Sequence, residues 1–251
     1  MTIKHPSAAD LPRLRQLWQE AFGDTDAFLD SFFQTAFHPE RCLCAWKEGR
    51  LASAIYWFDC TLGGEAVAYL YALATDKALR GKGIAGALMA GTHAHLKSRG
   101  CKAALLVPGE PSLAGYYRSM GYEFCGGIRS FSCAAAAVAA LKPLSAEEYA
   151  ALRRQYLPEN SVVQEGENLR FLAAQARFYA GEDFLLAARQ EENRLVCPEL
   201  LGNAGAAPGI VAALGCEEGT FRMPGEDSFA MGLPLNGGKL PPVRYFAFAF
   251  D

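Results

Sequence analysis

The sequence predicts an α+β protein built on a mixed sheet, and three observations carry this prediction. Runs of β-forming residues follow one another with only short glycine turns between them, as in antiparallel hairpins: 42–47, 50–62 and 66–75. A glycine-rich turn at 81–86 then leads into a helix with apolar residues at helical spacing, which ends at Arg99-Gly100. The nearly all-apolar run Lys102–Val107 follows and predicts a strand that is buried on both faces, as in parallel pairing.

The segments around these strands complete a first unit. Two amphipathic helices precede the strands: one begins at the capping-box-like Ser7-Ala8-Ala9-Asp10, and the other is capped by Asp24, Thr25 or Asp26. A helix is predicted at 111–120, and two strands at 122–126 and 128–133 follow it.

An internal repeat predicts a second, shortened copy of this unit. The segment Ile3–Leu11 can be laid on Leu141–Tyr149 at a constant offset of 138, where Lys, Ser and Ala coincide, and the match continues through Leu14/Leu152 and Arg15/Arg153. Chance similarity between two capped amphipathic helices is the alternative. On the repeat interpretation the chain divides into domains 1–138 and 139–251. The expected elements of the second domain are helices at 146–156, 165–178 and 206–214, and strands at 183–189, 194–201, 219–223, 228–233 and 244–250.

Composition excludes several classes of protein. The 251 residues are 51% hydrophobic and 20% charged, which excludes intrinsic disorder. A formal net charge of −3 argues against a nucleic-acid binder that neutralises phosphates along a whole face. Neither a signal peptide nor a membrane span is visible. The eight scattered cysteines include no Cys-x-x-Cys and read as small buried hydrophobes in a reducing compartment, so we expect a cytoplasmic protein without a metal site.

The motif that carries chemistry is Arg80-Gly81-Lys82-Gly83-Ile84-Ala85-Gly86, between a strand and a helix. Glycines allow a close backbone approach, and free N–H groups at a helix start bind phosphate. The spacing also fits the dinucleotide fingerprint G-x-G-x-x-G. We reject a Rossmann fold because the glycines begin five residues after the strand, no acid follows about 20 residues later, and the preceding strands read as hairpins. No Walker A loop occurs.

The order of elements around this motif resembles the GCN5-related N-acetyltransferases (GNAT). Arg80 to Ala85 matches that family's [Q/R]-x-x-G-x-[G/A] signature, and Tyr116-Tyr117-Arg118-Ser119-Met120-Gly121-Tyr122 resembles its second diagnostic segment. The resemblance covers about residues 1–133. It implies the acyl-CoA N-acyltransferase fold in tandem with a degenerate second copy. The corresponding turn of that copy, Asn203–Gly209, lacks the signature and its cations, so we expect no second acetyl-CoA site there.

The resemblance also assigns residues. Acetyl-CoA would be the co-substrate, with backbone groups of Leu73 and Thr75 pairing with its acetyl and pantetheine parts. Its pyrophosphate would bind the segment Arg80, Gly81, Lys82, Gly83, Ile84 and Ala85, where Lys82 could instead point to solvent. Tyr117 would be the general acid, although packing is an alternative role for it. Tyr116 is expected to pack in the core.

The base and the acceptor stay open. Glu110, His93 and His95 read better as surface or core residues than as a base. Tyr56, Trp57, Asp59 and Tyr69 would suit a cationic amine, with sheet packing as the alternative. We expect a small-molecule or peptide amine acceptor, with neither nucleic acid nor membrane as partner, and a homo-oligomer is left open. The sequence therefore predicts an acetyl-CoA-dependent N-acetyltransferase; the alternative is a non-catalytic module of the same fold that binds or senses acyl-CoA.

Overall fold

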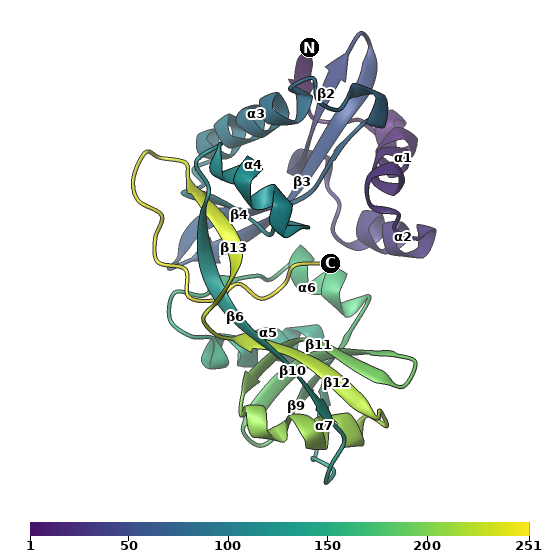
Figure 1. Cartoon of the computed structure of the whole chain (residues 1–251), viewed down its shortest axis with the longest axis vertical. Helices are drawn as coiled ribbons and strands as arrows, with labels where there is room; N and C mark the ends of the chain where they lie inside the picture. Colours follow the sequence, from purple (N-terminus) through teal and green to yellow (C-terminus); the bar gives the residue numbers. More distant parts are fainter. Residues whose placement is uncertain (251) are drawn as a thin grey trace. The chain divides into compact units, whose positions relative to one another are not determined.

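The computed structural model describes residues 1–250, which divide into two compact units (Figure 1). The first unit contains Met1–Val107 together with Gly232–Leu240. The second contains Pro108–Met231 and the residues from Pro241 onward. Each unit is thus discontinuous in the sequence, and each is described by itself.

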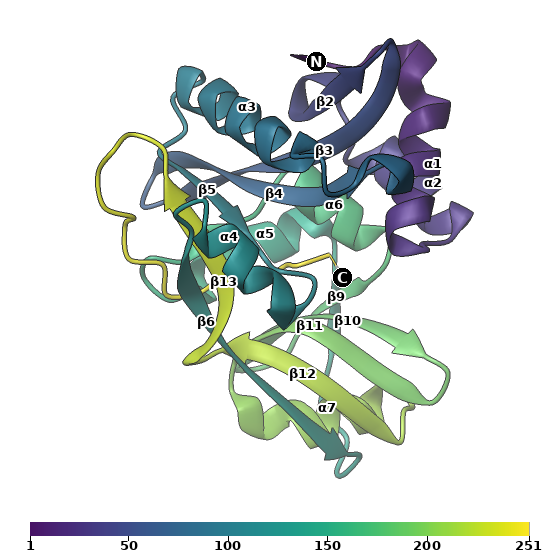
Figure 2. The ribbon, with the colours of Figure 1, turned by 45° about the horizontal axis from the view of Figure 1, so that its top comes forward.

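The first unit is a mixed sheet covered by helices on both faces. Its strands are β1 (Thr2–Lys4), β2 (Cys42–Lys47), β3 (Arg50–Leu62), β4 (Glu65–Thr75) and β5 (Ala103–Leu106). They pair in that order, antiparallel as far as β4, whereas β4 and β5 are parallel. Its helices are α1 (Leu11–Phe22), α2 (Asp26–Thr35) and α3 (Ile84–Ser98). Figures 1 and 2 show α3 on one face of the sheet and α1 with α2 on the other.

Aromatic side chains form the core between α1, α2 and the sheet. The ring of Trp18 lies 4.7 Å from that of Phe32, 5.1 Å from that of Tyr56 and 5.5 Å from that of Tyr71, measured between centroids. Trp18 also donates its indole N–H to Asp24 at 2.7 Å, so its one polar group is satisfied. This packing fixes the two helices against β3 and β4.

The second unit holds the remaining elements. Its helices are α4 (Ala114–Arg118), α5 (Ala146–Tyr156), α6 (Glu167–Ala173) and α7 (Ala207–Ala213). Its strands are β6 (Glu123–Ala134), β7 (Lys142–Leu144), β8 (Val162–Val163), β9 (Arg177–Ala180), β10 (Phe184–Glu191), β11 (Arg194–Gly202), β12 (Glu218–Pro224) and β13 (Asp227–Pro234). Strand β13 ends with residues that belong to the first unit.

The second unit repeats the architecture of the first. Its strands pair in the order β7, β9, β10, β11 and β12, and only β11 with β12 is parallel. Helices α5 and α6 follow the first of these strands, as α1 and α2 follow β1. Helix α7 stands between β11 and β12, as α3 does between β4 and β5. The mixed sheet is therefore confirmed, and the second unit has the order of elements that a shortened second copy would have.

Three predicted elements were wrong in detail. Residues 122–126 and 128–133 form the single strand β6 rather than two strands. The helix expected over 165–178 ends at Ala173, since the β-forming residues that follow pair with β7 and β10 as β9. The expected strand over 244–250 is a buried irregular segment.

A glutamine side chain explains why that last segment is not a strand. The Phe248 N–H donates to Oε1 of Gln164, and Nε2 of Gln164 donates to the Phe248 carbonyl, both at 2.9 Å. One side chain thus satisfies both backbone groups of a buried residue, as a neighbouring strand otherwise would. Elsewhere the segment bonds to β8, where the Val162 N–H donates to the Tyr245 carbonyl at 2.9 Å, and to β6.

The predicted domain boundary and the compact units do not coincide. The contacts divide the chain after Val107 and return residues 232–240 to the first unit, whereas the repeat places the boundary at 138/139. A boundary read from a repeat marks where a copy begins in the sequence, but contacts mark where its strands find partners. The two sequence domains remain a prediction.

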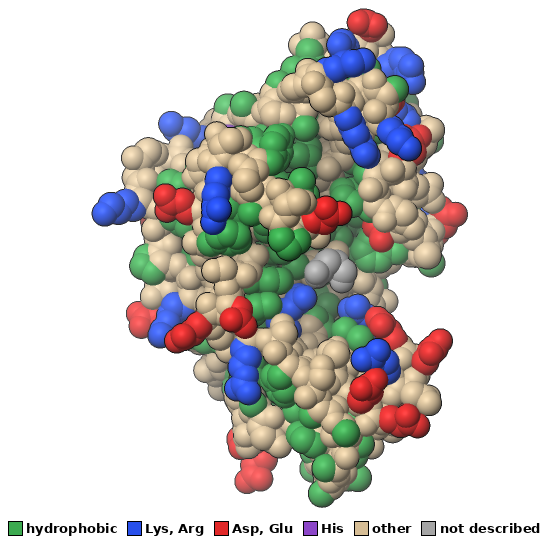
Figure 3. Space-filling model, in the orientation of Figure 1, with side chains coloured by type: hydrophobic (Ala, Val, Ile, Leu, Met, Phe, Trp, Pro, Cys, Tyr) green, Lys and Arg blue, Asp and Glu red, His purple; other side chains and the backbone are tan. Residues whose placement is uncertain are grey.

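The surface carries charges of both signs, as the near-balanced composition predicts, and most of the cysteines are buried. Lys and Arg side chains are interspersed with Asp and Glu over the face in view in Figure 3. No helix within residues 1–250 is long and apolar enough to cross a membrane. All eight cysteines are free; Cys125 and Cys133 are only half-buried, contrary to the expectation that all are buried.

A buried ion pair joins α5 to β11. Arg153 donates from Nε and Nη2 to the two carboxylate oxygens of Glu199 at 2.7 and 3.0 Å, and Tyr149 donates its hydroxyl to the same carboxylate at 2.5 Å. Both charged side chains are almost inaccessible to solvent. Such a pair is stable only while both partners are present, because either charge alone would be buried without compensation.

We expect Glu199→Gln to lower the free energy of unfolding by about 3–5 kcal/mol, because it leaves the Arg153 guanidinium buried without a counter-ion. Urea unfolding measures the change. Glu218→Gln is the control: it breaks the exposed Arg194–Glu218 pair and should cost about 0–1 kcal/mol. Equal losses in the two variants would contradict the role given to the buried pair.

Candidate functional site

A bulge in β4 reorganises the end of the strand that precedes the glycine turn. Ala54 pairs with Ala74 and Tyr56 with Tyr71, so one residue of β3 faces two residues of β4, Ala72 and Leu73. Ala72 has a φ of +51°, which is uncommon for a residue with a side chain. The bulge shifts the alternation of β4, and the residues after it present their backbone groups in a new phase.

Beyond the bulge, β4 leaves its other neighbour. The pairing of β4 with β5 ends at Tyr69 and Leu105, although β4 continues to Thr75. The Asp76 N–H donates to the Ala52 carbonyl at 2.8 Å, so Ser53 and Thr75 are a non-hydrogen-bonded pair. The backbone N–H and C=O of Thr75 therefore point away from β3. By alternation from Ala74 the same holds for Leu73.

Asp76 anchors the turn that follows. Its carboxylate accepts the Ala78 N–H at 2.9 Å and a guanidinium N–H of Arg13 at 2.5 Å. Arg13 also donates to the Leu51 carbonyl at 3.4 Å, so α1, β3 and the turn share one half-buried connection. The turn is thus held at its base and can leave its tip open.

The tip of the turn and the start of α3 carry unbonded amides. Gly81 and Gly83 have φ values of +73° and +74°, where glycine is favoured. No side chain caps α3. Within residues 1–250 the N–H groups from Gly83 to Gly86 donate no hydrogen bond. These are the orphan donors of a helix start, and the positive end of the helix dipole lies behind them.

The two cations of the motif are held by backbone carbonyls. Arg80 donates from Nε to the Thr75 carbonyl at 3.1 Å, and Lys82 donates from Nζ to the Ala78 carbonyl at 3.1 Å. Both side chains are exposed. They place positive charge beside the free amides, and the whole arrangement suits a polyanion such as a diphosphate.

Residues 2–125 match the family model of the acetyltransferase (GNAT) domain. The chain belongs to the GNAT acetyltransferase family. No curated protein sequence matches it.

Solved structures share the fold over nearly the whole chain. A GCN5-related N-acetyltransferase from Kribbella flavida has a TM-score of 0.73 and 17% identity, over 92% of this chain and 70% of that one. One from Anabaena variabilis gives 0.72 and 15%, over 94% and 73%. Eis1 from Mycobacterium abscessus gives 0.68 and 15%, over 94% and 74%. At these identities the likeness concerns the fold, which extends through both units.

In this GNAT protein the expected cofactor-binding residues form one continuous surface of the first unit. Leu73 and Thr75 lie on the open edge of β4, and the segment from Arg80 to Ala85 forms the turn and the start of α3. Ile84 is buried, so it could contribute only backbone to a ligand. Tyr117 lies on α4 and belongs to the second unit.

Tyr117 is half-buried, and burial raises the pKa of its phenol to about 12, with the neighbouring Tyr116 adding to the shift. Its ring meets that of the buried Tyr122 edge-on at 5.9 Å. The phenol is therefore protonated throughout the neutral range and can donate a proton. The expectation that Tyr116 packs in the core was wrong: 39% of it is exposed.

The other candidates for a base, Glu110 and His95, are surface or packing residues, as expected from the sequence. Glu110 is exposed and accepts a hydrogen bond from Ser112 at 3.1 Å. His95 packs between His5 and Trp57, with its Nε2 buried and without a partner among residues 1–250. Burial, followed by the charges of His5 and Arg99, lowers its pKa. A histidine in this setting is a packed core residue.

The four residues considered for the acceptor do not share one face of the sheet. Tyr56 packs on Trp18 and Phe32, beneath α1 and α2. Trp57 packs on His95 of α3, on the opposite face. Asp59 lies on the α3 side as well, 3.7 Å from Arg99, while Tyr69 stacks on Phe58. The three aromatic residues serve sheet packing, whereas Asp59 is exposed beside Arg99, so the four do not form one acceptor site.

In the second unit the turn that corresponds to 81–86 is filled. The Asn203 side chain accepts the Gly205 N–H at 2.8 Å and so caps the turn before α7. The alanine-rich junction also lies against α7: the Ala139 N–H donates to the Gly209 carbonyl at 3.0 Å. A side chain at Gly209 would come within 2.7 Å of the Ala137 carbonyl. The Asn203 cap and the alanine-rich junction thus occupy this turn, whereas the turn at 81–86 is open.

Sequence reasoning missed the supports of the site. Asp76 stands at a capping position two residues before Ala78, so its Asx-type bond is a local signal that could have been found. Its partner Arg13 is 63 positions away, and nothing in the spacing indicates that pair. The bulge at Ala72 has no sequence signal either, since glycine is the residue that usually marks such a backbone.

His93 should make the protein less stable in acid. Burial lowers its pKa from 6.5 to about 4, so the unfolded chain takes up the proton first as the pH falls. The stability contributed by neutral His93 is present above pH 6.5 and is lost between pH 6.5 and 4. We expect His93→Gln to flatten the decline of unfolding free energy over this range, measured by urea unfolding at several pH values.

The control is His38→Gln, since His38 is exposed. It should follow the wild-type profile. A wild-type slope that persists in His93→Gln would show that other groups cause the acid sensitivity.

Proposed function

We propose that this protein is an N-acetyltransferase that transfers the acetyl group of acetyl-CoA to an amine. The observation that carries the proposal is the run of unbonded N–H groups from Gly83 to Gly86, directly after the unpaired edge of β4. The family match over residues 2–125 supports the same activity.

The start of α3 would bind the diphosphate of acetyl-CoA. Four amides can donate to phosphate oxygens, and the helix dipole favours the negative charge. A Cβ built on Gly81 or Gly83 meets no atom within 4 Å, so the space in front of the turn is open. When the co-substrate binds, Arg80 and Lys82 would leave their backbone carbonyls and donate to phosphate oxygens instead, because a charged phosphate is the stronger acceptor.

The edge of β4 would orient the rest of the co-substrate. The amide-rich arm can pair with the backbone of Leu73 and Thr75 as an added strand does. Acetyl-CoA supplies the activated thioester. An N–H of this edge, aimed at the thioester carbonyl, would stabilise the negative charge that develops there.

Tyr117 would donate a proton to the departing thiolate. Its raised pKa keeps the proton on the phenol at neutral pH, and the acceptor amine has to be neutral when it attacks. The acceptor class is an amine on a small molecule or a peptide.

A carboxylate placed at the start of α3 tests the binding step. We expect Ala85→Glu to weaken acetyl-CoA binding at least about tenfold, because it repels the diphosphate. The same change should raise helix stability by about 0.3–1 kcal/mol, because an anion suits this end of the dipole. Calorimetric titration and thermal melting measure the two effects. Saturation of the wild type at about 100 times Kd should add about 2.7 kcal/mol of stability.

Ala90→Glu is the matched control, since Ala90 is exposed on the same helix beyond its first turn. It should bind acetyl-CoA like the wild type. Unchanged affinity in Ala85→Glu would refute the assigned binding surface.

Tyr117→Phe tests the acid. We expect kcat to fall by about 10²–10⁴-fold with a reactive amine, while the Kd for acetyl-CoA stays the same. Tyr116→Phe is the control beside it and should keep its activity. Release of CoA over a broad amine panel is the readout. Tight acetyl-CoA binding without amine-dependent CoA release in the wild type would support the alternative, a non-catalytic acyl-CoA-binding module.

A further inference from the structure

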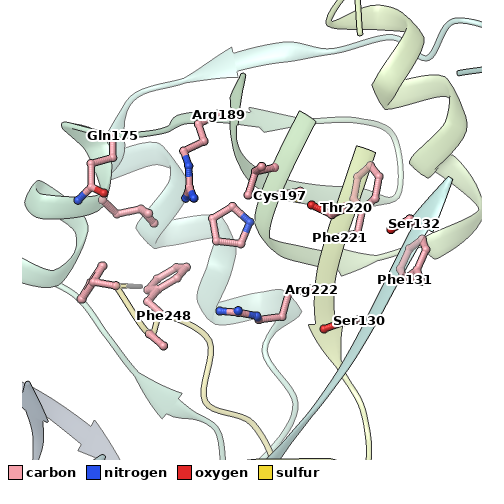
Figure 4. A pocket seen from close by; sticks show the side chains of 15 residues that line it. Ser130, Phe131, Ser132, Gln175, Arg189, Cys197, Thr220, Phe221, Arg222 and Phe248 are labelled. Carbon is pink, nitrogen blue, oxygen red and sulfur yellow. The ribbon is translucent and has the colours of Figure 1, made fainter. Parts of the chain in front are cut away.

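A cavity of about 300 Å³ lies on the sheet of the second unit (Figure 4). Its walls come from β6, β10, β11 and β12, from α6 and from the segment that ends at Phe250. The volume is at the lower end of the range for small-molecule sites. None of the features assigned to acetyl-CoA is part of it.

The strand register explains why this face is polar. Ser130 pairs with Arg222 and Ser132 with Thr220, and paired residues project to the same face. Phe131 and Phe221, at the alternate positions, stack on each other at 5.3 Å and pack in the core beside α7. The hydroxyls and the arginine thus line the face of the sheet away from α7.

A second arginine reaches the same space from β10. Arg189 pairs with Val196 of β11, which pairs with Thr220, so Arg189 projects to this face as well. Figure 4 shows the side chains of Arg189 and Arg222 extending from different strands into one space. Two guanidinium groups that converge on a cavity favour an anion.

No aspartate or glutamate lines the cavity among residues 1–250. Arg189 uses Nε for a 2.9 Å bond to Glu191, whose side chain is 56% exposed, and within residues 1–250 its two terminal nitrogens donate no hydrogen bond. The Arg222 guanidinium lies 4.6 Å from the ring centroid of Phe229, which holds its orientation.

The rest of the lining is apolar. Leu172 of α6 and Phe248 are almost fully buried, and Val196 and Pro198 of β11 add apolar surface on the same face of the sheet as the arginines. An inorganic ion would leave this apolar surface without a partner, whereas a ligand with an apolar body would cover it. The cavity therefore combines an anion-binding side with a hydrophobic side.

We propose that this cavity binds a small organic anion. Its carboxylate or phosphate group faces Arg189 and Arg222, and its apolar body contacts Phe248 and Leu172. The site is independent of the proposed acetyl transfer and differs from a second copy of the diphosphate site, because it lies on the face of the sheet opposite α7.

The test uses the full chain without acetyl-CoA and four probes of similar size. Benzoate and phenyl phosphate are the anions, benzamide is the neutral match and benzylamine is the cation. Ligand-observed saturation-transfer NMR with titration gives the affinities. We expect both anions to bind, with the preferred one identifying the acid group, and at least about tenfold tighter than benzamide or benzylamine.

Variants locate the binding. Arg189→Gln and Arg222→Gln should each weaken anion binding about tenfold, and Arg189→Glu should reverse the preference towards benzylamine, which an unfolded variant could not do. Arg194→Gln is the matched control: Arg194 at the start of β11 also pairs with a surface glutamate, Glu218 of β12, but it does not line the cavity.

The proposal is overturned if the four probes bind equally, if none binds, or if Arg194→Gln weakens anion binding as much as Arg189→Gln. Failure of acetyl transfer would not affect these outcomes, since no readout depends on turnover.

Discussion

The backbone at the start of α3 has to stay unbonded if it is to hold a ligand, and helix starts seldom remain so. Elsewhere in this protein the problem is solved in the usual way: Thr25, Ser145 and Asn203 each accept a backbone N–H at a helix start. Gly83 has no side chain and cannot do this. Support comes instead from Asp76, which fixes the base of the turn through Arg13 and leaves the amides beyond it free.

The end of β4 also has to keep backbone groups unbonded for a ligand. A strand inside a sheet normally forms hydrogen bonds through its N–H and C=O groups to both neighbouring strands. Here the bulge at Ala72 and the early end of the pairing with β5 leave one edge available over Leu73 to Thr75. The unpaired edge and the unpaired helix start are adjacent in the chain, and together they form a continuous backbone surface.

The two copies show how one architecture carries different interactions. Arg15 and Arg153 correspond in the repeat, yet Arg15 makes a surface pair with Asp30 at 2.8 Å, whereas Arg153 is buried on Glu199. The turn before α3 is open and the turn before α7 is closed by Asn203. The sheet order is kept in both, so fold is separable from the site placed on it.

Local patterns predicted most of the elements, because hydrophobic period, glycine turns and caps act over a few residues. They also located the turn at 81–86 and the capping box at Ser7. They failed where a residue far away in the sequence determines the local structure. Gln164 bonds the backbone of Phe248 in place of a neighbouring strand, and pairing with β7 makes Arg177 to Ala180 a strand. The cavity beside Arg189 and Arg222 is of this kind, since four strands and a terminal segment build it.

The return of residues 232–240 to the first unit has a consequence for synthesis. The Leu235 N–H donates to the Lys102 carbonyl at 2.9 Å, so a segment that is translated late bonds to the strand region that forms early. Because chains emerge from the ribosome in sequence order, the first unit lacks part of its structure until residues 232–240 have been made. Both halves of the molecule thus reach their finished state at almost the same moment.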